Sequence, residues 1–147
     1  MSASSRRPSR RAWVVAALAT TALLWAASTS VAALPACGGA ATKDWVGPAT
    51  GGSWQAGANW DGGAVPGAGD DVCIAGTGTV THLGATTTIA SLQTSGMGLT
   101  MSSGTLSVAS GADPSTIRGP LTLSGGTLDF DGGADLDSLS QTGGTLD

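Results

Sequence analysis

The stretch Ser103-Gly104-Thr105-Leu106 recurs as Gly125-Gly126-Thr127-Leu128 and again as Gly143-Gly144-Thr145-Leu146. The copies lie 22 and then 18 residues apart. A period near twenty residues is what one coil of a β-solenoid requires, because each coil stacks its leucines on those of the coil before it. Glycine supplies the positive φ angles that the corners between strands need. The repeat therefore predicts an all-β chain folded as a parallel β-helix, or β-solenoid.

Short alternating segments around the repeat also indicate strands, because apolar and polar residues alternate over a few positions and glycine separates them. These segments are Leu99-Thr100-Met101, Leu106-Ser107-Val108, Leu121-Thr122-Leu123 and Leu128-Asp129-Phe130. We expect residues 76–147 to form the solenoid coils. The third copy of the motif is interrupted at Asp147, so we expect a truncated part of a longer array. An antiparallel β-sandwich built from hairpins is the alternative fold.

Residues 33–75 differ in composition and are rich in tryptophan and glycine. We expect them to form an N-terminal cap on the solenoid. Trp45, Trp54 and Trp60 are separated by turn-forming residues. Two interpretations fit these tryptophans. Bulky apolar side chains can cover the first coil, and exposed indole rings can stack on sugars. The second interpretation makes the three tryptophans carbohydrate-binding candidates.

Residues 1–32 have the pattern of a signal-peptide helix, which implies processing by export machinery and signal peptidase. Arginines precede an uncharged apolar run, and small residues follow it, so that cleavage is expected after Ala32 or Ala33. The apolar run is shorter than the roughly 20 residues of a membrane-spanning helix. The sequence Ser9-Arg10-Arg11-Ala12-Trp13-Val14 leaves Sec and twin-arginine export open. We expect an extracellular or cell-surface protein with no stable membrane span after processing.

Cys37 and Cys73 are the two cysteines of the chain. In an oxidising compartment, an even number of cysteines in a small chain predicts a disulfide. The alternative is a lipoprotein, because Leu34-Pro35-Ala36-Cys37 resembles a lipoprotein cleavage box. A lipidated Cys37 cannot form a disulfide, so the two predictions exclude each other.

Acidic residues dominate the chain beyond the signal, where ten Asp stand against Lys43 and Arg118. A nucleic-acid partner is not expected, because phosphate contacts need clustered lysines or arginines. The same scarcity of cations leaves no cluster of lysines or arginines that could stabilise an oxyanion or a phosphate in an active site. We therefore do not expect an enzyme, and any catalytic part would lie beyond residue 147.

Several acidic residues and one histidine are candidates for chemistry. Asp129 with Asp131, and Asp135 with Asp137, lie two apart and would share a strand face, which is the arrangement of a carboxylate pair. Asp135 and Asp137 also lie in an imperfect copy of the nonapeptide calcium repeat, which makes calcium the one candidate cofactor. Asp70-Asp71 fits a turn better than an acid–base pair. His82, the single histidine, has no nucleophile motif beside it.

An N-terminal run has the form Trp54…Asn59-Trp60…Gly63…Pro66-Gly67…Asp70-Asp71-Val72-Cys73-Ile74. Together with the Thr- and Val-rich segments that follow and the later run Leu136–Leu146, it resembles secreted bacterial β-helix-type repeat proteins. These include adhesin-like and autotransporter-passenger-like chains. The resemblance covers most of residues 43–147. It implies that the tryptophan-rich part begins the solenoid.

The expected function is that of a secreted or cell-surface structural repeat module, an adhesin-like scaffold whose ligand the sequence does not name. Its partners would be surface glycans or other host or cell-surface molecules. An extracellular carbohydrate-binding or polysaccharide-processing fragment is the alternative, and a calcium-stabilised repeat module is the third hypothesis.

Overall fold

A computed structural model describes Cys37 and residues 41–147. The expected signal peptide, its cleavage at Ala32 or Ala33 and the twin-arginine motif all lie outside the described residues. No helix within the described part of the chain is long and apolar enough to cross a membrane.

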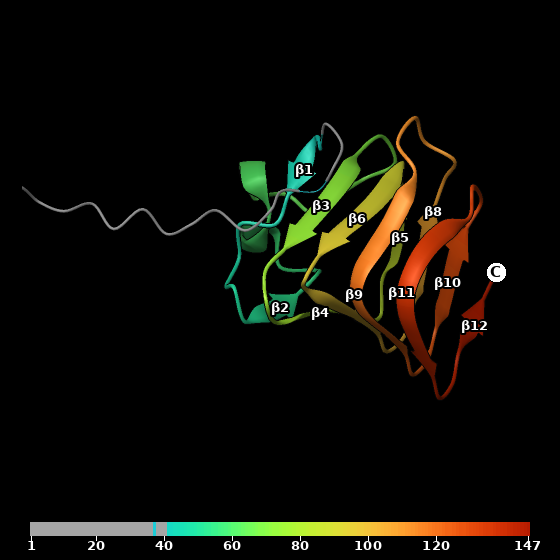
Figure 1. Cartoon of the computed structure of the whole chain (residues 1–147). Coiled ribbons are helices and arrows are strands. Elements are labelled where there is room, and N and C mark those ends of the chain that lie inside the picture. The colour runs from blue at the N-terminus through green and yellow to red at the C-terminus, as the bar shows by residue number, and fades with distance from the viewer. Residues whose placement is uncertain (1–36, 38–40) are drawn as a thin grey trace, which may run out of the picture. The chain divides into compact units, whose positions relative to one another are not determined.

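The described part of the chain is all-β, with 53% of its residues in strands and 6% in short helices. The strands are stacked as a β-solenoid of about four coils (Figure 1). In chain order the elements are β1 (Lys43–Asp44), β2 (Gly51–Ser53), the 3₁₀ helices η1 (Gly57–Asn59) and η2 (Asp61–Gly63), β3 (Asp71–Ala75), β4 (Thr79–His82), β5 (Thr86–Ile89), β6 (Ser91–Ser95), β7 (Gly98–Met101), β8 (Thr105–Val108), β9 (Ser115–Leu123), β10 (Thr127–Phe130), β11 (Ala134–Gln141) and β12 (Thr145–Leu146).

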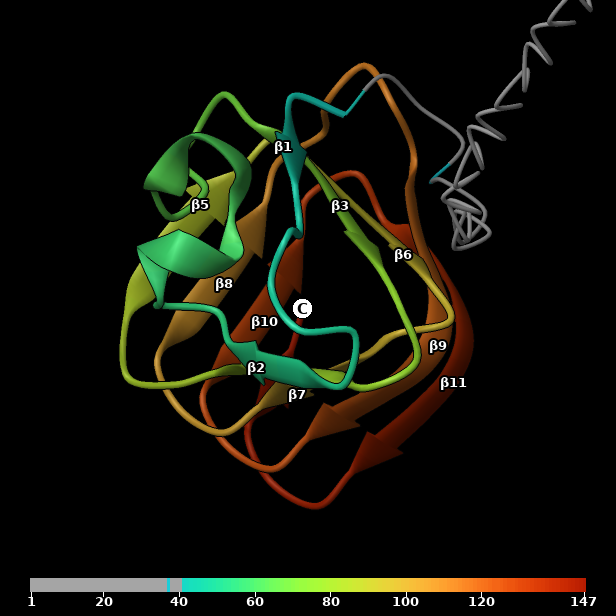
Figure 2. The same cartoon turned by 90° about the vertical axis from the view of Figure 1, so that its left-hand side faces the viewer.

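The coils have three sides, which Figure 2 shows in a view along the stack. Wall A contains β1, β3, β6 and the first halves of β9 and β11. Wall B contains β2, β4, β7 and the second halves of β9 and β11. Wall C contains β5, β8, β10 and β12. Every pairing between these strands is parallel, so the β-helix prediction is confirmed and the antiparallel sandwich is wrong.

The repeat seen in the sequence is the stacking unit of wall C. Leu106 pairs with Leu128, and Leu128 pairs with Leu146, so that the leucines of successive coils lie in one column. Leu106 and Leu128 are fully buried. Alternation within each strand directs these side chains into the core and the intervening residues outward.

Glycines also stack at the corner before wall C. Gly104, Gly126 and Gly144 have φ angles of 81°, 80° and 72°. These angles are in the left-handed region, where a Cβ atom is disfavoured. A Cβ on Gly126 would lie 2.5 Å from the carbonyl oxygen of Gly104 in the coil before it. The expected corner role of these glycines is therefore confirmed, and a close approach between coils adds to it.

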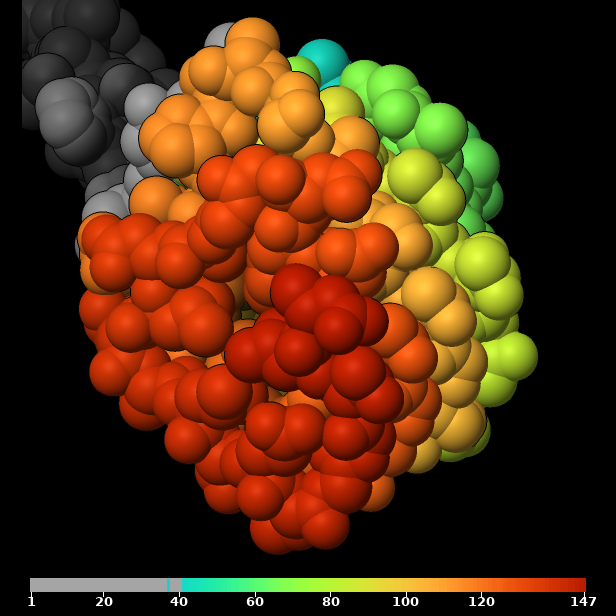
Figure 3. All heavy atoms as spheres, turned by 90° about the vertical axis from the view of Figure 1, so that its right-hand side faces the viewer, coloured from blue at the N-terminus to red at the C-terminus, as the bar shows by residue number. Residues whose placement is uncertain are grey.

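One continuous core fills the interior of the three walls. Its members are buried tryptophans in the first coil and, in the later coils, aliphatic and methionine side chains with one phenylalanine, Phe130. The largest fully buried side chains are Trp54, Trp60, Ile74, Ile89, Leu92, Met97, Leu99, Met101, Leu106, Ile117, Leu121 and Leu123. Figure 3 shows the opposite end of the stack, which the C-terminal residues form. Phe130, Leu136 and Leu146, from β10, β11 and β12, line a hollow of about 390 Å³ there.

A disulfide joins Cys37 to Cys73. The two Cα atoms are 5.8 Å apart, and the bridge spans 36 positions of the sequence. Cys73 lies in β3 and is buried, so the bridge ties the segment before β1 to the second coil. The predicted disulfide is confirmed, and the lipidated form of Cys37 is incompatible with it.

Candidate functional site

The tryptophans are core residues. Trp45, Trp54 and Trp60 expose 8%, 0% and 1% of their surface, which leaves no open ring face for a sugar. The ring centroids of Trp45 and Trp60 are 5.2 Å apart, those of Trp54 and Trp60 are 4.8 Å apart, and both pairs meet edge to face. The Trp60 indole N–H donates to the Trp54 carbonyl at 2.7 Å. Their burial favours the capping interpretation over sugar stacking.

His82 packs against Trp54 in the same core. Their ring centroids are 5.7 Å apart, and the histidine is fully buried. Its Nε2 atom lies 3.0 Å from Oγ1 of Thr87, which joins β4 to β5. Burial lowers the pKa of His82, because the charged imidazolium is poorly solvated, and the Ser103 backbone opposes that shift in part. This is the environment of a structural histidine.

Asp135 and Asp137 share a strand face, as predicted, but a cation of the chain lies between them. Arg118 donates to Asp135 Oδ2 at 2.5 Å and to Asp137 Oδ1 at 2.7 Å. These two hydrogen bonds raise the pKa of Arg118 further above its usual value. No group of three or more His, Cys, Asp or Glu residues within 37 and 41–147 could hold a metal ion. The guanidinium occupies the position that the calcium hypothesis required.

The strand-pair interpretation of Asp129 and Asp131 is wrong. β10 ends at Phe130, and Asp131 lies in the following turn, so the two carboxylates do not share a strand face. Asp129 instead stacks on Asp147, because the Asp147 N–H donates to the Leu128 carbonyl and the Asp147 carbonyl accepts from the Phe130 N–H. This flanking pattern places the two aspartates opposite each other in a parallel ladder.

Asp70 and Asp71 have separate local roles, in agreement with the turn interpretation. The Asp70 carboxylate accepts the backbone N–H of Gly67 at 2.8 Å. The Asp71 carboxylate accepts the hydroxyl of Ser91 at 2.7 Å, one coil away. Both carboxylates therefore stabilise the backbone and the stacking of the second coil.

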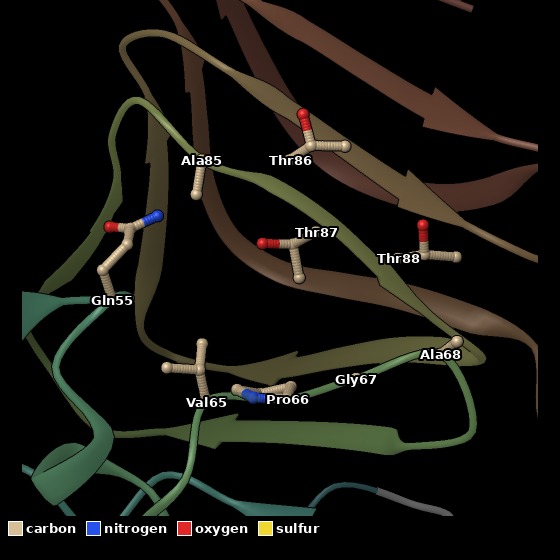
Figure 4. Close-up of a pocket in the computed structure, with 9 residues that line it drawn as sticks. All are labelled: Gln55, Val65, Pro66, Gly67, Ala68, Ala85, Thr86, Thr87 and Thr88. Atoms are coloured by element: carbon tan, nitrogen blue, oxygen red, sulfur yellow. The ribbon is translucent and has the colours of Figure 1, made fainter.

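The structure adds a groove that the sequence did not indicate. It lies between β5 and the loop that follows η2, and its volume is about 480 Å³ (Figure 4). That volume is within the roughly 300–1,000 Å³ range of ligand sites. The lining residues are Gln55, Val65, Pro66, Gly67, Ala68, Ala85, Thr86, Thr87 and Thr88.

One wall of this groove is a strand edge. Wall C begins at β5, because its place in the first coil is taken by η1, η2 and the loop of residues 64–69. β5 pairs with β8 on one side, and it has no strand partner on the other side among the described residues. The groove therefore lies where a preceding strand of wall C would be.

A side-chain amide lies at the end of the groove. Gln55 Oε1 accepts the backbone N–H of Leu83 at 3.2 Å and the hydroxyl of Ser53 at 3.4 Å. These contacts fix the amide orientation, because the flipped amide would place a donor against the Leu83 donor. Gln55 Nε2 is buried and has no hydrogen-bond partner in the described structure. Figure 4 shows this nitrogen directed toward the groove.

No short motif marked this site, because its lining consists of threonine, alanine, glycine, valine, proline and one glutamine, which are common in any exposed loop or strand. One signal was present at the level of the repeat. The strand Thr86–Ile89 lies one period before Thr105–Val108, and residues 64–69 before it have no strand pattern.

Comparison with known proteins adds nothing to this description of the fold and the site. No protein family, curated protein or solved structure was found to match this chain.

Proposed function

We propose that this chain is a secreted or cell-surface structural repeat module, an adhesin-like scaffold that acts by binding rather than by catalysis. The observation that carries the proposal is the Cys37–Cys73 disulfide within a stacked β-helix. Structural disulfides persist in oxidising compartments and are rare in the cytosol. The bridge thus agrees with export directed by residues 1–32 and with processing by signal peptidase. The resemblance to secreted bacterial β-helix-type repeat proteins points the same way.

The shape of the interior suits a scaffold. The core of the solenoid is filled by side chains from all three walls, and parallel backbone ladders connect the coils. These ladders hold successive coils in register, so the stack is a rigid support for surface residues. The buried indoles give no support for sugar stacking, and the Arg118 ion pairs give none for a calcium site.

The first experiment is the intact mass of the chain recovered from the medium and from the membranes of its own host. We expect a species that begins near Ala33 and is lighter than its reduced form by the two thiol hydrogens. A species with lipid on Cys37 would contradict the disulfide. A cytosolic species with an uncleaved N-terminus would contradict export.

Surface display is tested separately with intact cells. We expect an antibody against the folded solenoid to label unpermeabilised cells or the protein in their medium. The same antibody on cells that express the chain without residues 1–32 is the control, and labelling there should require permeabilisation. Equal labelling of the two strains before permeabilisation would remove the basis for a surface scaffold.

A further inference from the structure

We propose that the groove beside β5 binds an extended peptide segment of a partner protein, which adds to the free edge of β5 as a new strand of wall C. The proposal joins three features: the free strand edge, the groove of about 480 Å³ next to it, and the unpartnered amide of Gln55. It holds whether or not the chain is exported, and it goes beyond the scaffold function by naming the class of partner.

The backbone of β5 has peptide groups on the groove side that β8 does not pair. Its hydrogen bonds to β8 use alternate residues: Thr105 N–H donates to the Ala85 carbonyl, and Ala109 N–H donates to the Ile89 carbonyl. In a parallel ladder the residues between these direct their peptide groups to the opposite side. Thr86 and Thr88 therefore direct their N–H and C=O groups toward the groove. They have no backbone partner on that side among the described residues.

An unpaired strand edge is a template for an additional strand, and extended peptides are bound in this way through main-chain hydrogen bonds. β5 is four residues long, and a strand rises about 3.3 Å per residue, so a partner segment of about four residues would cover it. The loop of residues 64–69 forms the opposite wall. Pro66 and Ala68 line that wall, so the added strand would have a partner on one edge and an apolar contact on the other.

Gln55 adds a directed donor to this arrangement. Its Oε1 atom is held by Leu83 and Ser53, so Nε2 cannot exchange places with it without the loss of a hydrogen bond. A buried donor without a partner is destabilising, because it has lost its hydrogen bonds to water. A backbone carbonyl at the end of the added strand would satisfy this donor.

Charge specifies the peptide further. None of the nine residues that line the groove is ionisable. The described chain contains ten Asp and two cations, and both cations are already paired with aspartates. A charged residue inside the groove would lose its solvation without a counter-ion. The complementary segment is therefore neutral over its central four residues and carries Lys or Arg at its flanks.

A glycan is the rival occupant of such a groove. The observations favour a peptide, because the three indoles of the first coil are buried and the free groups of the groove are the repeating N–H and C=O of a strand edge. A sugar has no matching repeat of main-chain donors and acceptors.

The test uses nitrogen-15-labelled protein and a pool of blocked hexapeptides as the probe. The peptides have lysine at both ends and threonine, valine, serine or glycine at the four central positions. We expect the amide resonances of Thr86 and Thr88 to move on titration, while those of Thr127 and Leu128 in the interior of wall C stay in place. The best peptide is then resynthesised with N-methyl groups on alternate residues, and we expect one of the two methylated registers to lose binding.

Two matched variants locate the site. Ala68→Asp places a charge in the groove wall, and Ala64→Asp places the same charge on an exposed residue of the same loop outside the lining. We expect Ala68→Asp to weaken peptide binding about tenfold or more and Ala64→Asp to change it by less than about twofold, a difference of at least about 1 kcal/mol. Equal thermal melting of the two variants establishes that folding is unaffected.

The proposal is overturned if no peptide of the pool moves the Thr86 and Thr88 resonances. It is also overturned if both N-methyl registers bind as well as the parent peptide, or if the two aspartate variants bind equally. Plant and bacterial polysaccharides are titrated in parallel. If they move the same resonances and the peptides do not, the groove is a glycan site and the peptide proposal is wrong.

Discussion

Nε2 of His82 lies 3.0 Å from Oγ1 of Thr87, so that the single histidine of the chain links two walls of the solenoid inside its core. Because burial lowers the pKa of His82, the native state binds a proton less readily than the unfolded chain does. The unfolded state therefore takes up more protons as the pH falls below its histidine pKa of about 6.5. The contribution of neutral His82 to stability is fully present above that pH and is lost progressively below it.

We expect the urea midpoint of the wild-type protein to fall between about pH 6.5 and pH 5, before most carboxylates titrate. His82→Gln should be less stable at pH 8 and should show a flatter profile over this range. Thr87→Val is the control, because it removes the hydrogen bond but keeps the titratable ring. A wild-type midpoint that does not change with pH in this range would contradict the assignment.

The disulfide should contribute about 3–4 kcal/mol to the free energy of unfolding, from the chain-entropy estimate for a loop of this length. Chemical denaturation with and without reductant measures this difference. The double variant Cys37→Ser/Cys73→Ser is the control, and its midpoint should match the reduced wild type and ignore reductant. A reductant effect in the double variant would show that the difference has another origin.

Gly126 should not tolerate a side chain. Its φ of 80° and the 2.5 Å approach to the Gly104 carbonyl would strain Gly126→Ala in two ways. We expect a loss of more than about 2 kcal/mol in the free energy of unfolding. Gly69→Ala is the matched control, because nothing lies within 4 Å of a Cβ at Gly69. Similar unfolding free energies for the two variants would contradict the stacked-corner geometry.

Trp54 should act as a packing residue and not as a ligand contact. Trp54→Ala removes a fully buried indole, and we expect a loss of about 3–5 kcal/mol. Val46→Ala, at a position that is 58% exposed, should cost far less. The tryptophan emission of the wild type should not change with added polysaccharides. Quenching by a polysaccharide at constant thermal stability would restore the sugar-stacking hypothesis.

Arg118 should make the acidic face of β11 independent of calcium. A chelator should leave the melting temperature of the wild type unchanged, because the guanidinium already holds Asp135 and Asp137. Arg118→Ala should lower the melting temperature only slightly, since exposed ion pairs contribute little. Asp131→Asn, at an exposed turn residue, is the control for a simple change of charge. A wild-type melting temperature that drops with chelator would revive the calcium hypothesis.

Periodicity was enough to predict the parallel solenoid, because leucine and glycine recur at the positions that stack, as the Leu106–Leu128–Leu146 column shows. Contacts between distant coils were not predictable in the same way. Arg118 has no acidic neighbour in the sequence, yet it pairs with two aspartates 17 and 19 residues later. The strand register shifts between Leu136 and Ser138, and no local pattern reveals such a shift.

The groove was missed for a related reason. Its existence depends on which wall lacks a strand in the first coil, and that is a property of the stack and not of any short segment. Gln55 becomes informative only when Leu83, 28 residues later, fixes the orientation of its amide.

The tryptophan cluster of the first coil makes the two ends of the stack different. Parallel strands exposed at both ends of a solenoid would allow molecules to join end to end without limit. Trp45, Trp54 and Trp60 close the interior at one end, while wall C keeps an open strand edge beside them at β5. The buried indoles leave no open core on which a second molecule could stack at this end, while the edge of β5 stays available to one short strand.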